Sequence, residues 1–141
     1  MKEKTNVLIL TDGSNDTTEM AAGIAAEIAA AFKGSKVQVK TAAEFQGNDI
    51  LPAEVFFLGC QAPKPDSFAY LADVLAHINL AQRPCGVFSP ASQEAAAYLA
   101  ALVRDSDAAL NPTPLFAASA AGSSGRKWVR NTVCGLFRRK R

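Results

Sequence analysis

Runs of consecutive apolar residues alternate with segments of helical periodicity along this chain of 141 residues. The runs at residues 6–10 and 55–58 lack polar alternation, which is typical of strands that are covered on both faces. Between the strand-like runs, apolar residues recur every three or four positions, which predicts amphipathic helices. The expected strands are residues 6–10, 36–40, 55–58, 84–88 and 115–118, and the expected helical stripes run from Met20 to Phe32, Phe68 to Ile78, Tyr98 to Val103 and Trp128 to Phe137.

The alternation of strands with helix-length connections predicts parallel strands joined by right-handed crossovers. Lysines at both ends of residues 36–40 favour an edge position for that strand, because charge blocks pairing with another molecule. The sequence therefore predicts an α/β fold with three layers, a doubly wound five-stranded parallel sheet in strand order 2-1-3-4-5. In such a sheet the ligand crevice lies outside the carboxyl ends of strands 1 and 3.

Polar residues mark the expected starts of three helices. Asp16 followed by Glu19 is a variant of the capping box. Asp66 or Ser67 is expected to cap the second helix, and Ser89-Pro90 to supply the cap and first residue of the third.

Composition is close to the globular average, with 49% apolar and 20% charged residues, and the length suits one domain spanning 1–141. The chain has no apolar run of 18 residues and no signal-peptide pattern, so no transmembrane segment is expected. The three cysteines, Cys60, Cys85 and Cys134, lack CxxC spacing. They are expected to be reduced thiols in a cytoplasmic protein.

Charge is divided unevenly along the chain. The residues before 126 carry thirteen acids and eight bases, a net charge of −5, whereas 126–141 carries seven bases and no acid. This basic C-terminal helix and tail follows a Gly-Ser-Ser-Gly segment, 122–125, that is expected to be flexible. We favour a solvated helix end over binding of anionic lipid, and no nucleic-acid partner is expected. Docking of an acidic redox partner is a further alternative.

Three segments carry a resemblance to a known family. They are the hydroxyl-rich loop at residues 11–17, the Thr-Glu-Met-Ala segment at 18–21 and Leu58-Gly59-Cys60. With the whole-chain order of elements, they resemble the flavodoxins. That family binds flavin mononucleotide (FMN), and its members carry single electrons or act as quinone and flavin reductases. The family's phosphate loop reads approximately T-x-T-G-x-T, with hydroxyls and N–H groups around the phosphate.

The resemblance implies an FMN site, a redox partner protein and, in some reductases of this type, a homodimer that completes the site. Tyr70 is the expected aromatic neighbour of the flavin ring, because Phe68 falls on the buried stripe. The residues implied in cofactor binding are Thr11, Gly13, Ser14, Asn15, Thr17, Cys60, Gln61, Tyr70 and Ser89.

The chain departs from the family pattern in two ways. Asp16 stands where the family has its second glycine, and Asp12 adds another carboxylate. Each would repel a phosphate by roughly 1 kcal/mol. The stretch after the fourth strand, residues 89–93, is short and lacks glycine and aromatic residues. The alternative function is therefore a flavodoxin-fold scaffold or binding module that has lost FMN binding, and enzymatic activity is left open.

Other chemistries find little support. A phosphatase loop built on Cys60 would need arginine at position 66, where the chain has Asp66, so Cys60 is expected to be a small buried residue. His77 has no metal-binding partner four residues on. A response-regulator receiver would need paired acids after the first strand, and only Asp12 is present there.

Overall fold

A parallel sheet forms the centre of the molecule in the computed structural model, which describes residues 5–90, 92–104, 106–116 and 122–135. Its strand order is β2-β1-β3-β4-β5, with β6 also paired to β4, and every pairing is parallel. This confirms the predicted order and class. The strands are β1 (Asn6–Thr11), β2 (Lys36–Thr41), β3 (Val55–Gly59), β4 (Pro84–Ser89), β5 (Ala109–Leu110) and β6 (Leu115–Phe116).

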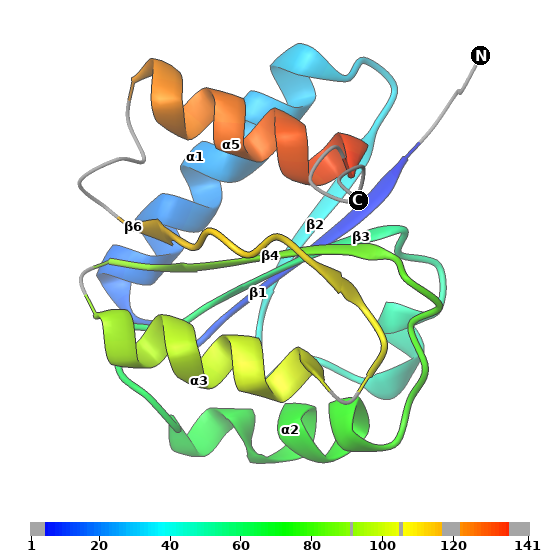
Figure 1. Ribbon diagram of the computed structural model, residues 1–141, viewed down its shortest axis with the longest axis vertical. Helices are drawn as coiled ribbons and strands as arrows, with labels where there is room; N and C mark the ends of the chain where they lie inside the picture. The colour runs from blue at the N-terminus through cyan, green and yellow to red at the C-terminus, as the bar shows by residue number, and fades with distance from the viewer. Residues whose placement is uncertain (1–4, 91, 105, 117–121, 136–141) are drawn as a thin grey trace.

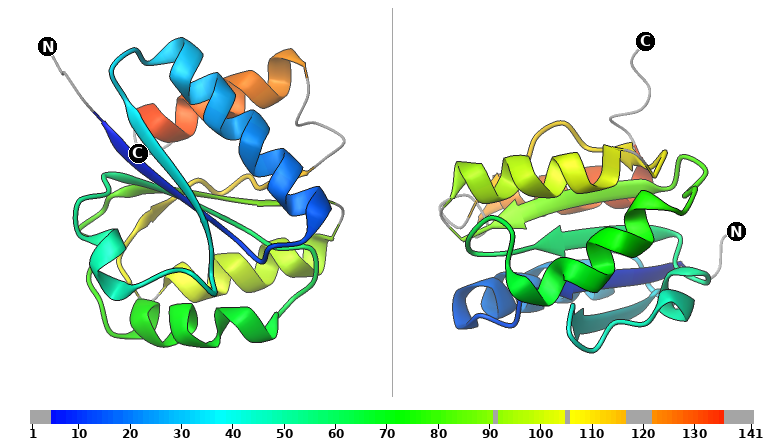
Figure 2. Two further views of the ribbon diagram at one scale, coloured as in Figure 1. Left: turned by 180° about the vertical axis from the view of Figure 1, so that it is seen from behind. Right: turned by 90° about the horizontal axis from the view of Figure 1, so that it is seen from below.

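Helices cover both faces of the sheet, as Figures 1 and 2 show. On one face lie α1 (Asn15–Ala31) and α5 (Ser123–Cys134), and on the other α2 (Ala69–Ala76) and α3 (Gln93–Arg104). Two 3-10 turns, η1 (Gly47–Ile50) and η2 (Asp66–Phe68), lie in the connections before β3 and α2. Within the described residues, no helix has the length and apolarity that crossing a membrane requires.

Alternating side chains of the inner strands fill two separate cores. Val7 and Ile9 of β1 pack with α1 and α5, whereas Leu8 and Leu10 pack with α2 and α3. All four are at most 2% exposed. Burial on both faces explains why this strand is uniformly apolar in sequence.

The far edge of the sheet differs from the prediction of one strand at residues 115–118. Two short segments share that edge, since Cys85 of β4 pairs with Leu110 and Phe88 of β4 pairs with Leu115. The interruption contains Pro112 and Pro114, and proline has no N–H to donate to the sheet. Residues 117 and 118 lie outside the described part of the chain, as do Leu136 and Phe137 of the expected final helix.

The predicted cap of the first helix is wrong. Ser14 is the N-cap of α1, and its carbonyl accepts the Thr18 N–H at 2.9 Å. Asp16 is instead an exposed residue of the first turn. The helix begins two residues before the expected position, and the Asp12 side chain accepts a hydrogen bond from the N–H of its N-cap, Ser14, as described below.

The caps predicted for the next two helices are also wrong. Asp66 and Ser67 belong to η2, whose N-cap is Pro65, and the Pro65 carbonyl accepts the N–H of Phe68 at 2.9 Å. Ser89 ends β4 because it pairs with β6, and Ser92 accepts the Ala95 N–H at 3.0 Å at the start of α3. The segment expected to be flexible supplies the first turn of α5.

Candidate ligand-binding site

The loops that follow β1, β3 and β4 lie at the carboxyl edge of the sheet, on the left in Figure 1. The strand order changes direction here, because β1 connects first to β2 on one side and the chain then continues to β3 on the other. A change of this kind separates two neighbouring loops and leaves a crevice between them. The loops after β1 and β3 are therefore the place to look for a site.

Asp12 joins these two loops through its carboxylate. Its Oδ1 accepts the backbone N–H of Ser14 at 3.0 Å and lies 2.8 Å from the Ser14 hydroxyl, which donates to it. Its Oδ2 accepts the backbone N–H of Gln61, from the loop after β3, at 2.8 Å. Hydrogen bonds to an ionised acceptor are stronger than neutral ones. We call this arrangement the Asp12–Gln61 bridge.

Two further hydroxyls of the first loop form hydrogen bonds within the loop. The Ser14 and Thr17 hydroxyl oxygens are 2.7 Å apart, and Thr17 is completely buried. The buried Thr11 hydroxyl accepts the N–H of Gly13 at 3.2 Å, and Gly13 has a φ of +85°, a conformation that favours glycine. The structure thus brings Thr11, Gly13, Ser14 and Thr17 together.

The first turn of α1 adds opposing electrostatic effects. The N–H groups of residues 15–17 precede the first intrahelical bond, and a helix N-terminus favours anions. Asp16 places a carboxylate in this same turn, while Asn15 is exposed. The loop therefore combines donors that suit an anion with two fixed negative charges, Asp12 and Asp16.

Cys60 lies immediately before Gln61 and is inaccessible to solvent, which confirms the expected burial. Burial, with a smaller contribution from the negative charge of Asp12, raises its pKa to about 12. Burial also raises the pKa of Tyr98. A thiol held neutral in this way is a poor nucleophile, which argues against covalent chemistry at Cys60.

Tyr70 and Ser89 have other partners. The Tyr70 hydroxyl accepts the N–H of Gly47 at 3.0 Å, and its ring lies 5.8 Å from that of Phe45, between centroids. Tyr70 is thereby attached to the connection between β2 and β3. Ser89 is buried, and its hydroxyl accepts the N–H of Ser92 at 3.2 Å. Among the described hydrogen bonds, none joins Tyr70 or Ser89 to the residues of the Asp12–Gln61 bridge.

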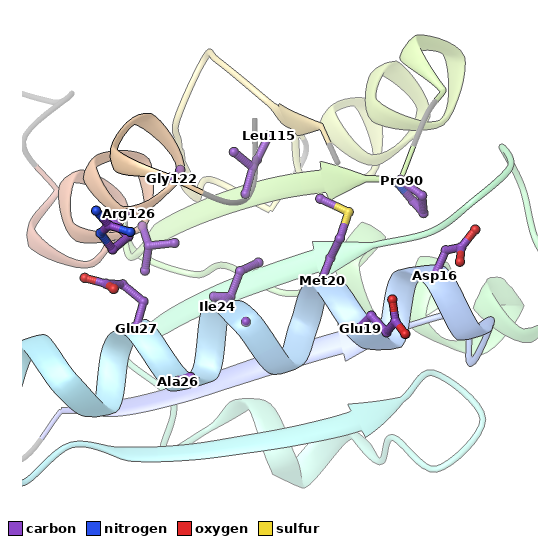
Figure 3. A pocket seen from close by; sticks show the side chains of 13 residues that line it. Asp16, Glu19, Met20, Ile24, Ala26, Glu27, Pro90, Leu115, Gly122 and Arg126 are labelled. Atoms are coloured by element: carbon purple, nitrogen blue, oxygen red, sulfur yellow. The ribbon is translucent and has the colours of Figure 1, made fainter. Parts of the chain in front are cut away.

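A separate hollow opens between α1 and α5. Its volume is about 810 Å³, and Met20, Ile24, Leu115 and Val129 contribute apolar surface. Figure 3 shows Asp16, Glu19 and Pro90 at one end of this hollow and Glu27 and Arg126 at the other. In the described part of the chain, no group of three His, Cys, Asp or Glu residues is arranged to hold a metal ion.

Sequence reasoning missed the central role of Asp12, which it treated only as a repulsive charge. The signal was present, because Asp-Gly-Ser favours a turn in which the aspartate side chain bonds to the backbone two residues on. The contact with Gln61 had no local signal. It joins positions 49 residues apart in the chain and follows from the pairing of β1 with β3.

The donor set suits the phosphate of a nucleotide better than it suits a flavin ring. The Ser14 N–H and hydroxyl already hold an anion, the carboxylate of Asp12, so their positions are those of an anion-binding loop. A phosphate would have to take the place of that carboxylate. Neither residues 60–65 nor residues 89–92 include an aromatic side chain to stack on a ring.

The similarity of this chain to known proteins is seen in its structure and not in its sequence. No protein-family model and no curated protein matches the sequence. The structure is similar to a flavodoxin from Streptococcus pneumoniae TIGR4, with a TM-score of 0.73 and 14% identity, over 94% of this chain and 99% of that one. Oxidised flavodoxin 1 from Bacillus cereus gives a TM-score of 0.72 and 18% identity, over 99% of this chain and all of that one.

Part of a larger protein is also similar in structure. The flavodiiron core Flv1 from Synechocystis sp. PCC6803 matches with a TM-score of 0.68 and 19% identity, over 98% of this chain and 37% of that one. At such identities the likeness establishes the fold. The full-length matches and the strand order β2-β1-β3-β4-β5 show that this chain has a flavodoxin-like fold.

Proposed function

We propose that this chain binds FMN at the carboxyl edge of its sheet and serves in electron transfer. The observation that carries the proposal is the convergence of the Ser14 N–H and hydroxyl on the carboxylate of Asp12, at the N-terminus of α1. The full-length likeness to flavodoxins supports it. FMN has a phosphate that such a loop can hold, with the helix dipole adding to the attraction.

Each part of the site has a proposed role. Ser14 and Thr17 would bind the phosphate through their hydroxyls, and residues 15–17 through their N–H groups. Gln61 and the residues after it, through Pro65, would lie beside the flavin ring. When bound, the flavin supplies one-electron chemistry, so the protein needs no catalytic acid or base and contributes binding and orientation.

A second candidate is a binding module of the same fold that works without FMN. The Asp12–Gln61 bridge favours it, because the donors that would hold a phosphate are already engaged. Asp16 adds repulsion in the same turn. Each negative charge would weaken phosphate binding by roughly 1 kcal/mol, or about fivefold in Kd.

Titration with FMN discriminates between the candidates. The purified protein is examined for flavin absorption bands, and FMN fluorescence is followed as protein is added. Saturable quenching at micromolar protein supports the proposal. Thr17→Val should weaken binding about tenfold, since it removes a hydroxyl and keeps the shape, whereas Ser124→Ala, at the first turn of α5, should not change it. Absence of quenching by any variant up to millimolar concentrations selects the second candidate.

The electron partner is part of the same proposal. Arg126 and Lys127 are exposed on α5, and Arg130 forms an ion pair with Glu27 at 2.7 Å. We propose that these residues, together with the basic residues at 138–141, dock an acidic redox protein in the cytoplasm, since opposite charge accelerates encounter. Removal of residues 138–141 should slow association at low salt, and an unchanged rate would reject the idea. Size-exclusion chromatography with and without FMN tests for the homodimer.

A further inference from the structure

We propose that the Asp12 carboxylate is an internal competitor of the ligand phosphate, so that ligand binding breaks the Asp12–Gln61 bridge and releases the loop after β3. This inference rests on the proposed function, since it concerns the regulation of the same site. It assigns to Asp12 a role that is separate from simple charge repulsion.

The hydrogen bonds show why the competition is direct. The Ser14 N–H donates to Asp12 Oδ1 at 3.0 Å, and the Ser14 hydroxyl lies 2.8 Å from the same atom. One N–H group has room for one strong acceptor, so a phosphate bonded to Ser14 must displace the carboxylate. The apparent Kd of the ligand is then its intrinsic Kd divided by the fraction of molecules in which Asp12 has moved away.

Displacement also affects the second loop. Asp12 Oδ2 holds the N–H of Gln61 at 2.8 Å, and residues 61–64 are otherwise exposed. Lys64 in this loop has a φ of +53°, a conformation that is strained for a residue with a side chain. When the carboxylate leaves, Gln61 loses its acceptor and the loop loses its attachment to the first loop. Phosphate binding at α1 is thereby coupled to the conformation of the loop that would face the ring.

Asp16 provides a matched comparison, because it is the other carboxylate of the site and has no part in the bridge. Asp16→Asn removes a negative charge and leaves the Ser14 and Gln61 bonds intact. It should tighten FMN binding about fivefold through charge alone. Asp12→Ala removes the charge and the competition together, and should tighten binding by at least about twentyfold. Asp12→Asn keeps the shape of the side chain, and its gain in FMN affinity should fall between those of Asp16→Asn and Asp12→Ala. It replaces the alanine variant in the test if that variant is poorly folded.

Amide hydrogen exchange at Gln61 gives a readout without flavin. In the ligand-free protein, Asp12→Ala should accelerate exchange of this amide at least tenfold, and Asp16→Asn should leave it unchanged. Adding FMN to the wild-type protein should also accelerate it. Faster exchange in Asp12→Ala, together with tighter FMN binding than in Asp16→Asn, supports the inference.

Two other outcomes separate the inference from the proposed function. If FMN binds the wild type but Asp12→Ala binds it no more tightly than Asp16→Asn, or if Gln61 exchange does not respond to Asp12→Ala, Asp12 is no competitor and the proposed function stands. If exchange responds to Asp12→Ala but no variant binds FMN at millimolar concentrations, the proposed function fails, and the regulatory role fails with it.

Discussion

The side-chain amide of Asn111 donates a hydrogen bond to the hydroxyl of Thr132 at 2.9 Å, and both side chains are buried. Asn111 lies just after β5 at the interrupted edge of the sheet, and Thr132 lies on α5. Next to this bond, the indole Nε1 of Trp128 donates to the carbonyl of Thr113 at 2.6 Å. Side chains of α5 therefore form hydrogen bonds with polar groups of residues 111–113. This segment lies between β5 and β6, where Pro112 and Pro114 interrupt the sheet.

Replacing Thr132 with valine tests this anchor. The substitution keeps the volume but leaves the Asn111 amide buried without its acceptor, so the free energy of unfolding should fall by about 1–3 kcal/mol. Urea unfolding followed by the fluorescence of Trp128, the single tryptophan, measures it. Thr113→Val is the control, since its side chain is exposed and only its backbone is used, and it should change stability by less than about 0.5 kcal/mol. Equal effects would contradict the anchor.

Two glycines should respond to alanine in opposite directions. A Cβ at Gly59 would overlap the ring of Phe88, which is itself completely buried, so Gly59→Ala should destabilise the protein by about 1–3 kcal/mol. A Cβ at Gly23 in α1 would meet nothing within 4 Å. Gly23→Ala should therefore stabilise by about 0.5–1 kcal/mol, because alanine is the better helix former. Thermal unfolding monitored by circular dichroism gives both values. A Gly59→Ala variant as stable as the wild type would contradict the packing described for Phe88, and a destabilised Gly23→Ala variant would contradict the open space at Gly23.

The uniform apolar runs and helical stripes were enough to predict the layers, because burial on both faces imposes that pattern on inner strands. The strand order also required Lys36 and Lys40, which placed the second strand at the edge of the sheet. The pattern failed at the last sheet edge. Ala109 and Leu110 form a strand of two residues, too short to leave a periodic signal. Pairing with β4 establishes this strand, and pairing depends on residues distant in sequence.

The candidate site was predicted only in part. The local loop sequence indicated that Ser14 and Thr17 would lie together at a helix N-terminus, and they do. Helix caps were predicted least well. Ser89, for example, was expected to cap the third helix, but it pairs with Phe116 and is therefore the last residue of β4. The partner of Asp12 could not be predicted from sequence, because Gln61 is 49 residues away and comes close to Asp12 only when the sheet forms. The donor is also a backbone N–H, which nearly every residue type has.

Arg83 should be important for the connection before β3. Its Nη1 donates to the carbonyls of Ile50 at 3.2 Å and Ala53 at 2.9 Å, and lies 3.4 Å from that of Leu51. Arg83→Met keeps the aliphatic stem and removes these donors, so the free energy of unfolding should fall by about 1.5–3 kcal/mol. Arg104→Met, an exposed arginine on α3, is the matched control. Chemical denaturation compares the two, and an equal loss would mean that the carbonyl contacts contribute nothing specific.

Thiol reactivity should distinguish the three cysteines. Cys60 and Cys85 are buried, and burial raises the pKa of each thiol to about 12, whereas Cys134 is exposed. At pH 8 a disulfide reagent should therefore modify one thiol rapidly in the native protein and all three in denaturant. Cys134→Ser should abolish the rapid reaction. Rapid modification of two or more thiols before unfolding would contradict the burial of Cys60 or Cys85.

The same thiols predict a loss of stability in alkali. Their pKa values in the folded protein, about 12, exceed the ordinary value of 9.0 that applies in the unfolded chain. Between these values the unfolded thiols lose protons that the folded thiols keep, so ionisation favours unfolding. The contribution to stability is complete below pH 9 and declines as pH rises toward 12. The urea midpoint should fall between pH 8 and pH 10.5, and it should fall less in Cys85→Ala, where one of the two thiols is absent. An identical decline in that variant would mean that groups other than Cys85 cause it.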